Sequence, residues 1–140
     1  GPALATETPD DAYFAAMAIG TAGDVSAAGE PLRAILAGRP RLVRVQRALA
    51  VVNDYELGRI DADMAALVLD GQRFIERAEW SKADETLSAA VERNGDYFAA
   101  WHDLGRVYLP RFGGQVVYAV ASSPPPQASK RTGLIPPIVV

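Results

Sequence analysis

The sequence has no cysteine and only one histidine among its 140 residues. The missing thiols exclude a disulfide scaffold, a thiolate zinc site, an iron–sulfur cluster and a cysteine nucleophile. No apolar run reaches the ~20 residues that a membrane-spanning helix needs. The net charge of −3 and the isoelectric point near 5.1 argue against a protein that coats nucleic acid through bulk charge.

Lysine is also scarce, because only two lysines accompany 12 arginines, while alanine is abundant. This usage fits a GC-rich bacterial genome, and it does not distinguish the cytoplasm from the periplasm. The length suits one domain, or one domain with a tail, and can bury a core without disulfides or a structural metal. Gly1-Pro2 resembles the remnant of a cleaved purification tag, so residues 1–9 are interpreted as a tag scar and a flexible N-terminus.

Hydrophobic periodicity and helix-ending residues predict an all-α domain over residues 10–110, built from five or six antiparallel helices. Asp24 and Asp61 are predicted to cap helices, and Pro31 and Pro40 are placed in the first turn of two others. The candidate segments, of which five or six are expected as helices of the fold, are 11–19, a short one after Asp24, 31–38, 40–57, 61–77, 81–94 and 96–109. Their short connections favour antiparallel neighbours.

Residues 111–140 differ in character and are predicted to form an extended, proline-rich tail rather than a second domain. Ser122–Pro126 favours a polyproline conformation, and residues 115–120 (QVVYAV) are rich in β-branched side chains. The apolar end comprises Leu134, Ile135, Pro136, Pro137, Ile138, Val139 and Val140. Several outcomes stay open: packing on the protein's own helices, docking into a partner or a neighbouring copy, a small β element with 115–120, or disorder.

Three residues of one predicted helix have counterparts 34 positions later. The pairs are Leu67 with Trp101, Gly71 with Gly105, and Phe74 with Tyr108. With the small, large, small series of Ala83, Leu87 and Ala90 between them and Trp80 before it, residues 64–108 resemble the tetratricopeptide repeat. A generic antiparallel bundle with the same core residues is the alternative interpretation.

The resemblance implies a fold of stacked helical hairpins in which small residues, such as Gly71, allow close approach and large ones fill the grooves. It also implies that one face holds an extended segment of a partner protein, mainly through the first helix of each pair. The residues that it assigns to this role are Asp70, Arg73, Arg77, His102, Asp103 and Arg106.

A run of arginines offers a second type of site, because residues 31–53, between Glu30 and Asp54, contain no acidic residue. The run consists of Arg33, Arg39, Arg41, Arg44 and Arg47. Three of these are predicted to share one face of the helix, opposite an apolar stripe that contains Val45 and Leu49. The face would suit nucleic acid or another polyanion, or it is a solvated surface whose arginines pair with acids at 54–63 or 79–92.

No catalytic, metal or cofactor site is expected. His102 has no second histidine to share a metal, and the nucleophile elbow Gly-x-Ser-x-Gly is absent from the sequence. We therefore predict a non-enzymatic adaptor or assembly factor that binds another protein or peptide, with homo-oligomerisation as a further expectation. Polyanion binding, and a recognition module whose C-terminal peptide is processed after Lys130-Arg131, remain as alternatives.

Overall fold

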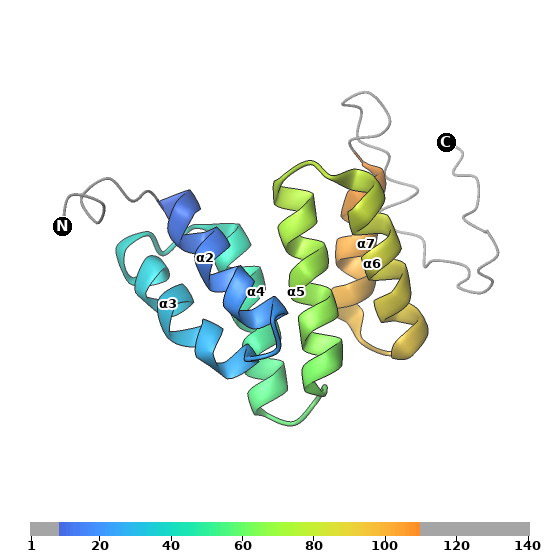
Figure 1. The fold of residues 1–140 in the computed structure, drawn as a ribbon, viewed down its shortest axis with the longest axis horizontal. Coiled ribbons are helices and arrows are strands. Elements are labelled where there is room, and N and C mark those ends of the chain that lie inside the picture. Colours follow the sequence, from blue (N-terminus) through green and yellow to red (C-terminus); the bar gives the residue numbers. More distant parts are fainter. Residues whose placement is uncertain (1–8, 110–140) are drawn as a thin grey trace.

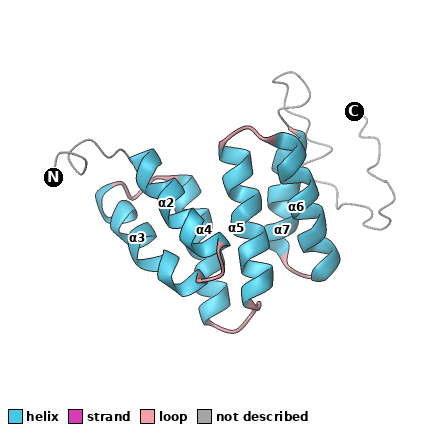
Figure 2. Cartoon of the chain, in the orientation of Figure 1, coloured by secondary structure: helices cyan, strands magenta, loops and turns pink. Residues whose placement is uncertain are grey.

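The computed structural model describes residues 9–109, and helices joined by turns and loops, without strands, make up this part of the chain. Its helices are α2 (Pro9–Thr21), α3 (Val25–Gly38), α4 (Val43–Glu56), α5 (Ala62–Glu76), α6 (Trp80–Arg93) and α7 (Phe98–Tyr108), as Figure 2 shows. The all-α prediction is therefore confirmed for the described residues. The predictions for residues 1–8 and for the tail from 110 to 140 fall outside them.

Two of the expected caps are present. The Asp24 carboxylate accepts a hydrogen bond from the Ala27 amide at 3.3 Å, at the start of α3. The Asp61 carboxylate accepts one from the Met64 amide at 2.8 Å, at the start of α5. Each cap satisfies an amide that the first turn of a helix leaves without a partner.

The two proline predictions are wrong. Pro31 does not begin a separate helix, because it lies inside the continuous helix α3. A proline removes one backbone hydrogen bond and crowds the preceding turn, yet buried residues on both sides, Ala28 and Leu32, pack the helix into the core. Pro40 precedes α4 rather than joining its first turn, and its carbonyl accepts a hydrogen bond from Gln46 Nε2 at 2.7 Å.

Helix α5 is the centre of the arrangement. It packs against α2 and α4 on one side and against α6 and α7 on the other (Figure 1). Helices α2, α3 and α4 follow one another as packed neighbours, as do α5, α6 and α7. Most of the packing between the two halves therefore involves residues of α5.

A glycine lets α5 and α6 approach closely. A Cβ atom built on Gly71 would lie 2.4 Å from Leu87 Cγ, so no side chain fits between the two helices there. Leu87, Ala83 and Ala90 are fully buried in α6. The prediction that small residues allow close packing is confirmed at this hairpin.

Candidate functional site

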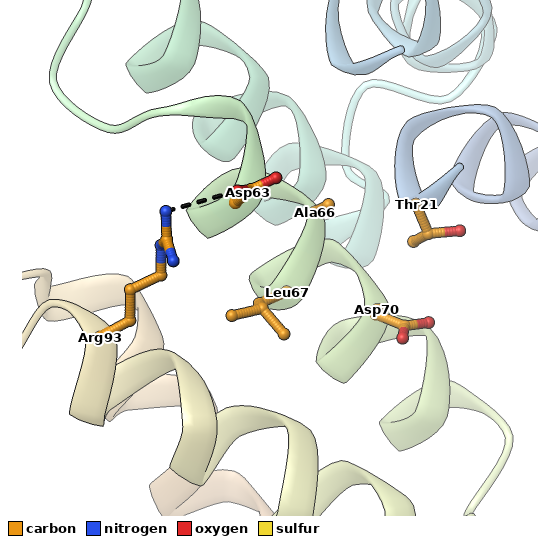
Figure 3. A pocket seen from close by; sticks show the side chains of 6 residues that line it. All are labelled: Thr21, Asp63, Ala66, Leu67, Asp70 and Arg93. Atoms are coloured by element: carbon orange, nitrogen blue, oxygen red, sulfur yellow. Dashed lines mark hydrogen bonds and ion pairs between the residues drawn. The ribbon is translucent and has the colours of Figure 1, made fainter. Parts of the chain in front are cut away.

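An open groove crosses the face of α5 between α2 and α6, with a cavity volume of about 360 Å³ (Figure 3). We call it the α5 groove, and its lining residues are Thr21, Asp63, Ala66, Leu67, Asp70 and Arg93. Four of the six come from successive turns of α5, because residues three or four apart lie on one helix face. Ala66 and Leu67 add apolar surface to an otherwise polar groove.

An arginine of α6 lines the end of the groove that lies at the N-terminus of α5, where it pairs with two aspartates. Arg93 pairs with Asp61 at 2.9 Å and with Asp63 at 3.4 Å. The Met64 amide and the Arg93 guanidinium stabilise the Asp61 carboxylate, which lowers the pKa of Asp61 below its usual range. These charges are exposed to solvent, so the ion pairs contribute little to stability and are open to exchange.

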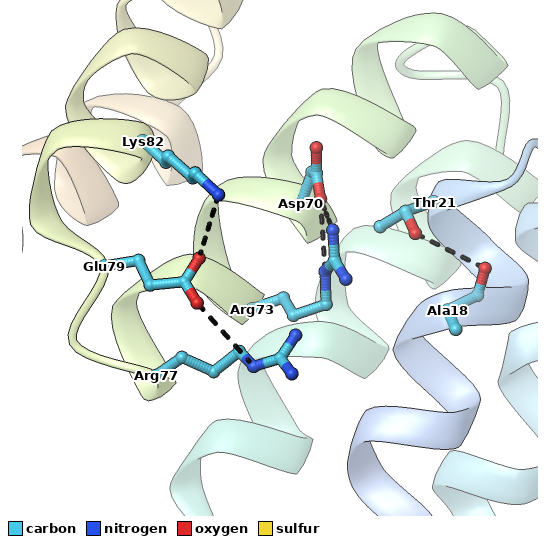
Figure 4. Close-up of polar contacts among 7 residues, drawn as sticks. All are labelled: Ala18, Thr21, Asp70, Arg73, Arg77, Glu79 and Lys82. Carbon is cyan, nitrogen blue, oxygen red and sulfur yellow. Dashed lines mark hydrogen bonds and ion pairs between the residues drawn. The ribbon is translucent and has the colours of Figure 1, made fainter.

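Basic residues lie around the C-terminus of α5 and the start of α6 (Figure 4). Arg73 Nη2 lies 2.5 Å from Asp70 Oδ1, while Glu79 lies between Arg77, at 4.0 Å, and Lys82, at 3.8 Å. Three basic side chains, Arg73, Arg77 and Lys82, therefore lie beyond the Asp70 end of the groove, each close to a carboxylate.

Aromatic rings support these cations. The Arg73 guanidinium lies 5.0 Å from the centre of the Phe74 ring, and Lys82 lies 5.8 Å from the same ring. Arg77 lies 5.3 Å from the ring of Phe14, which belongs to α2. Such contacts orient a cation without neutralising it. The guanidinium groups thus keep the capacity to bind a carboxylate.

The structure separates the six predicted partner-binding residues. Three of them, Asp70, Arg73 and Arg77, lie together on α5 at or beside the α5 groove. His102 is exposed on α7, where its ring stacks on that of Phe98 with the ring centres 5.8 Å apart. The last two, Asp103 and Arg106, lie on α7 and contact another side of α5.

Asp103 and Arg106 take part in an internal polar cluster between α5 and α7. Asp103 is only 1% exposed and accepts hydrogen bonds from Gln72 Nε2 at 2.8 Å and from Arg106 Nη1 at 2.9 Å. Arg106 also pairs with Glu76 at 3.2 Å. The cluster joins the two helices, and its carboxylate is not accessible to a partner.

Sequence reasoning missed Gln72 and Glu76, which complete this cluster. Both lie one turn apart on a face of α5 that also carries the buried residues Val68 and Leu69. The sequence did contain one indication, because Gln72 falls on the same helix face as apolar positions that are expected in the core. A buried polar group requires a hydrogen-bond partner. The pattern does not indicate that the partner is Asp103.

The arginine run does not form a single exposed face. Arg33, Arg39 and Arg41 are exposed. Arg44 pairs with Asp10 of α2 and lies over the ring of Tyr13. Its acidic partner is therefore not one of the acids at 54–63 or 79–92 that the sequence predicted. Arg47 is half-buried, and its burial, together with the nearby Arg106, lowers its pKa. The apolar stripe opposite the run is buried as predicted.

Within residues 9–109, no group of three or more histidine, aspartate or glutamate side chains is arranged to hold a metal ion. None of helices α2 to α7 is both long and apolar enough to cross a bilayer.

A second hollow, of about 400 Å³, lies where the α4–α5 turn meets the α6–α7 connection. Its lining residues are Asp54, Arg59, Asn94, Asp96, Tyr97, Phe98 and Ala99.

A tyrosine at this second hollow yields a prediction about alkaline pH. Tyr97 donates a hydrogen bond to Asp54 Oδ2 at 2.7 Å, and burial together with this carboxylate raises the pKa of Tyr97. Above pH ~10 the unfolded tyrosine ionises while the folded one stays neutral, so the free energy of unfolding should fall. We expect Tyr97→Phe to cost about 1 kcal/mol at pH 7 and to weaken this decline.

Urea unfolding at pH 7, 9 and 11 would measure the effect. Tyr13, whose pKa burial also raises, remains in the variant, so the decline should become shallower without vanishing. Parallel curves for the variant and the wild type would show that Tyr97 does not contribute to it.

No protein-family model matches the chain, and no significant match is found among curated proteins or solved structures. The tetratricopeptide resemblance of residues 64–108 therefore stays a prediction from the 34-residue spacing. What the protein does is inferred below from the geometry of the described residues.

Proposed function

We propose that this protein is a non-enzymatic adaptor or assembly factor that binds an extended segment of a partner protein in the α5 groove. The observation that carries the proposal is a solvent-open groove with charged side chains in and beside it, whose ion pairs are exposed at Arg93 and partly exposed at Asp70 and Arg73. Arg93 and Asp63 bound one end, and Arg73 and Arg77 follow toward the other.

The distance from the acidic end of the groove to the arginines beyond it favours an extended occupant. Asp63 and Arg77 are fourteen positions apart on α5, which corresponds to about 21 Å along the helix axis. An extended segment of about six residues covers this length at about 3.3 Å per residue. A segment with a basic group near Asp63 and acidic groups near Arg73 and Arg77 would complement the charges.

The helical hairpin of α5 and α6 supports assigning residues 64–108 to a tetratricopeptide-like module. Its glycine at 71 admits Leu87, which agrees with the small and large positions of that repeat. We therefore extend the proposal to a repeat-like scaffold that presents a peptide groove. The groove, however, uses α2 as one wall, so it is not made by the repeat-like residues alone.

Affinity capture with matched variants tests the proposal. Bait protein with Arg73→Gln and Arg77→Gln should lose partners that both the wild type and the control variant retain, with at least tenfold lower recovery. The control carries Arg33→Gln and Arg39→Gln, the same change of charge at exposed arginines of the α3 C-terminal region. Circular dichroism would verify that each bait is folded.

Equal recovery by all three baits, or no specific partner for the wild type, would contradict the groove proposal. A version ending at Ser123 adds a separate comparison. Partners that are lost only on this truncation would assign docking to the C-terminal segment instead.

Polyanion binding has weaker support. Arg44 is paired with Asp10 and Arg47 is half-buried, which leaves Arg33, Arg39 and Arg41 as exposed members of the run. We therefore do not propose it as the function, although a steep loss of affinity with salt would indicate it.

A further inference from the structure

Two buried polar atoms within residues 9–109 make no hydrogen bond to another described group. One is the hydroxyl of Tyr13, a residue of α2 that is 0% exposed. The other is Oε1 of Gln72, which lies on α5 and is 3% exposed. The orientation of this amide is fixed, because its Nε2 donates to Asp103 Oδ2 at 2.8 Å. Buried polar atoms are nearly always hydrogen-bonded in proteins, so both atoms point to a bound group.

An arginine of α4 likewise makes neither an ion pair nor a hydrogen bond with the described residues. This residue, Arg47, is half-buried, and its burial and the charge of Arg106 lower its pKa. The other two arginines of this region, Arg44 and Arg106, are each paired with an acidic residue. A guanidinium that is partly removed from water is costly unless an acceptor faces it. Arg47 therefore adds a free, positively charged donor to the two buried atoms.

The three groups lie around Asp103, where four helices meet. Helices α2, α4 and α7 all pack on α5. The Asp103 carboxylate accepts the hydrogen bond from Gln72, and its charge acts on both Tyr13 and Arg47. The charge of Glu76, on α5, acts on the same two residues. The hydroxyl, the amide oxygen and the guanidinium therefore belong to one site.

We propose that Tyr13, Gln72 and Arg47 bind one hydrogen phosphate ion at this junction. The Arg47 guanidinium and the Tyr13 hydroxyl donate to its oxygens, while its own P–O–H group donates to Gln72 Oε1. An anion without a hydroxyl, such as sulfate or acetate, satisfies the two donors but leaves the amide oxygen without a partner. None of the three residues lines the α5 groove, so the proposal does not depend on the proposed function.

The surrounding charges suit this ion. The arginines Arg44, Arg47 and Arg106 attract an anion, and they outnumber the two carboxylates beside the site, Glu76 and Asp103. These carboxylates repel an anion most strongly when it has no proton to donate. The side chains of Arg44, Arg106 and Glu76 are 22%, 17% and 23% exposed, so the cluster reaches the surface of the described part and a small ion has access.

Titration calorimetry of the full-length protein with inorganic phosphate, at pH 7 and constant ionic strength, tests the proposal. We expect a Kd of about 1 mM or lower, and binding of sulfate that is at least about fivefold weaker. Tyr13→Phe should weaken phosphate binding at least about tenfold, the usual loss for a hydrogen bond to a charged group. This variant should fold normally, because the hydroxyl that it lacks makes no hydrogen bond to the described residues.

Two arginine variants complete the comparison. Arg47→Gln should also reduce phosphate affinity at least about tenfold. Its matched control, Arg33→Gln, makes the same change at an exposed arginine of α3 and should bind phosphate as the wild type does. Circular dichroism would verify the fold of each variant, and Tyr13→Phe alone decides the test if Arg47→Gln does not fold.

Three results would overturn the proposal. Equal affinity for phosphate, sulfate and acetate would show general attraction of anions. Unchanged phosphate binding by Tyr13→Phe would place the ion elsewhere on the protein. The absence of heat, together with an unchanged unfolding temperature in about 20 mM phosphate, would show that no phosphate binds. Phosphoserine serves as a further arm, and tighter binding of phosphoserine than of phosphate would assign the site to a phosphorylated partner instead.

Discussion

Gly71→Ala is expected to lower the free energy of unfolding by about 1–3 kcal/mol, although alanine is normally the better helix former. The added methyl group would lie 2.4 Å from Leu87 Cγ and 2.5 Å from Leu87 Cδ2. Leu87 is fully buried, so it cannot move aside without disturbing the core. The steric cost therefore exceeds the gain of about 0.5–1 kcal/mol that the loss of a helical glycine would bring.

Urea unfolding of the purified protein measures this effect, and another glycine serves as its control. Gly38→Ala places a methyl group in open space at the end of α3 and should leave the free energy of unfolding nearly unchanged. A double-mutant cycle with Leu87→Ala isolates the contact, because shortening Leu87 makes room for the new methyl group. The double variant should lose less free energy of unfolding than the two single variants lose together. A harmless Gly71→Ala would mean that α5 and α6 are farther apart than described.

Asp103→Ala should destabilise the protein by about 2–3 kcal/mol, since it removes one member of a buried polar cluster. The Gln72 amide and the Arg106 guanidinium would each lose an acceptor at less than 3 Å. Arg106 would keep Glu76, which is why we expect the loss to stay below that of a fully buried charge left alone. Thermal and urea unfolding would both report the change.

Two further variants make this test specific. Asp63→Ala removes an aspartate whose side chain is 82% exposed and should have almost no effect on stability. Asp103→Asn retains an acceptor for Gln72 but removes the charge that faces Arg106, so it should be intermediate. If Asp103→Ala were as mild as Asp63→Ala, the cluster would not contribute to the packing of α5 against α7.

The cluster also explains why the site prediction was only partly informative. The 34-residue spacing pointed to α5 and α7. Asp70 does line the α5 groove, and Arg73 and Arg77 lie beside it. Asp103 and Arg106 have the same polar character in the sequence. They differ from the residues beside the groove only because they are packed against a neighbouring helix. That packing depends on Gln72 and Glu76, which are 31 and 30 positions away in the sequence.

The N-terminal half illustrates a different limit. Pro31 predicts a helix start from its own geometry, and locally this is the favourable choice. The continuous helix α3 exists because Val25, Ala28 and Leu32 pack on the same core. Likewise, Arg44 is paired with Asp10 of α2 rather than with the acids nearer in the sequence.

The sequence by itself determined that the described part is all-helical, approximately where α5, α6 and α7 begin and end, and that Asp24 and Asp61 cap helices. These features depend on residues within one or two turns, which the sequence pattern displays directly. Only the tertiary structure decided which side of α5 forms a groove, which polar groups are buried, and why no side chain fits at Gly71. Each of these depends on which helix lies beside which, and therefore on contacts between residues that are far apart in the sequence.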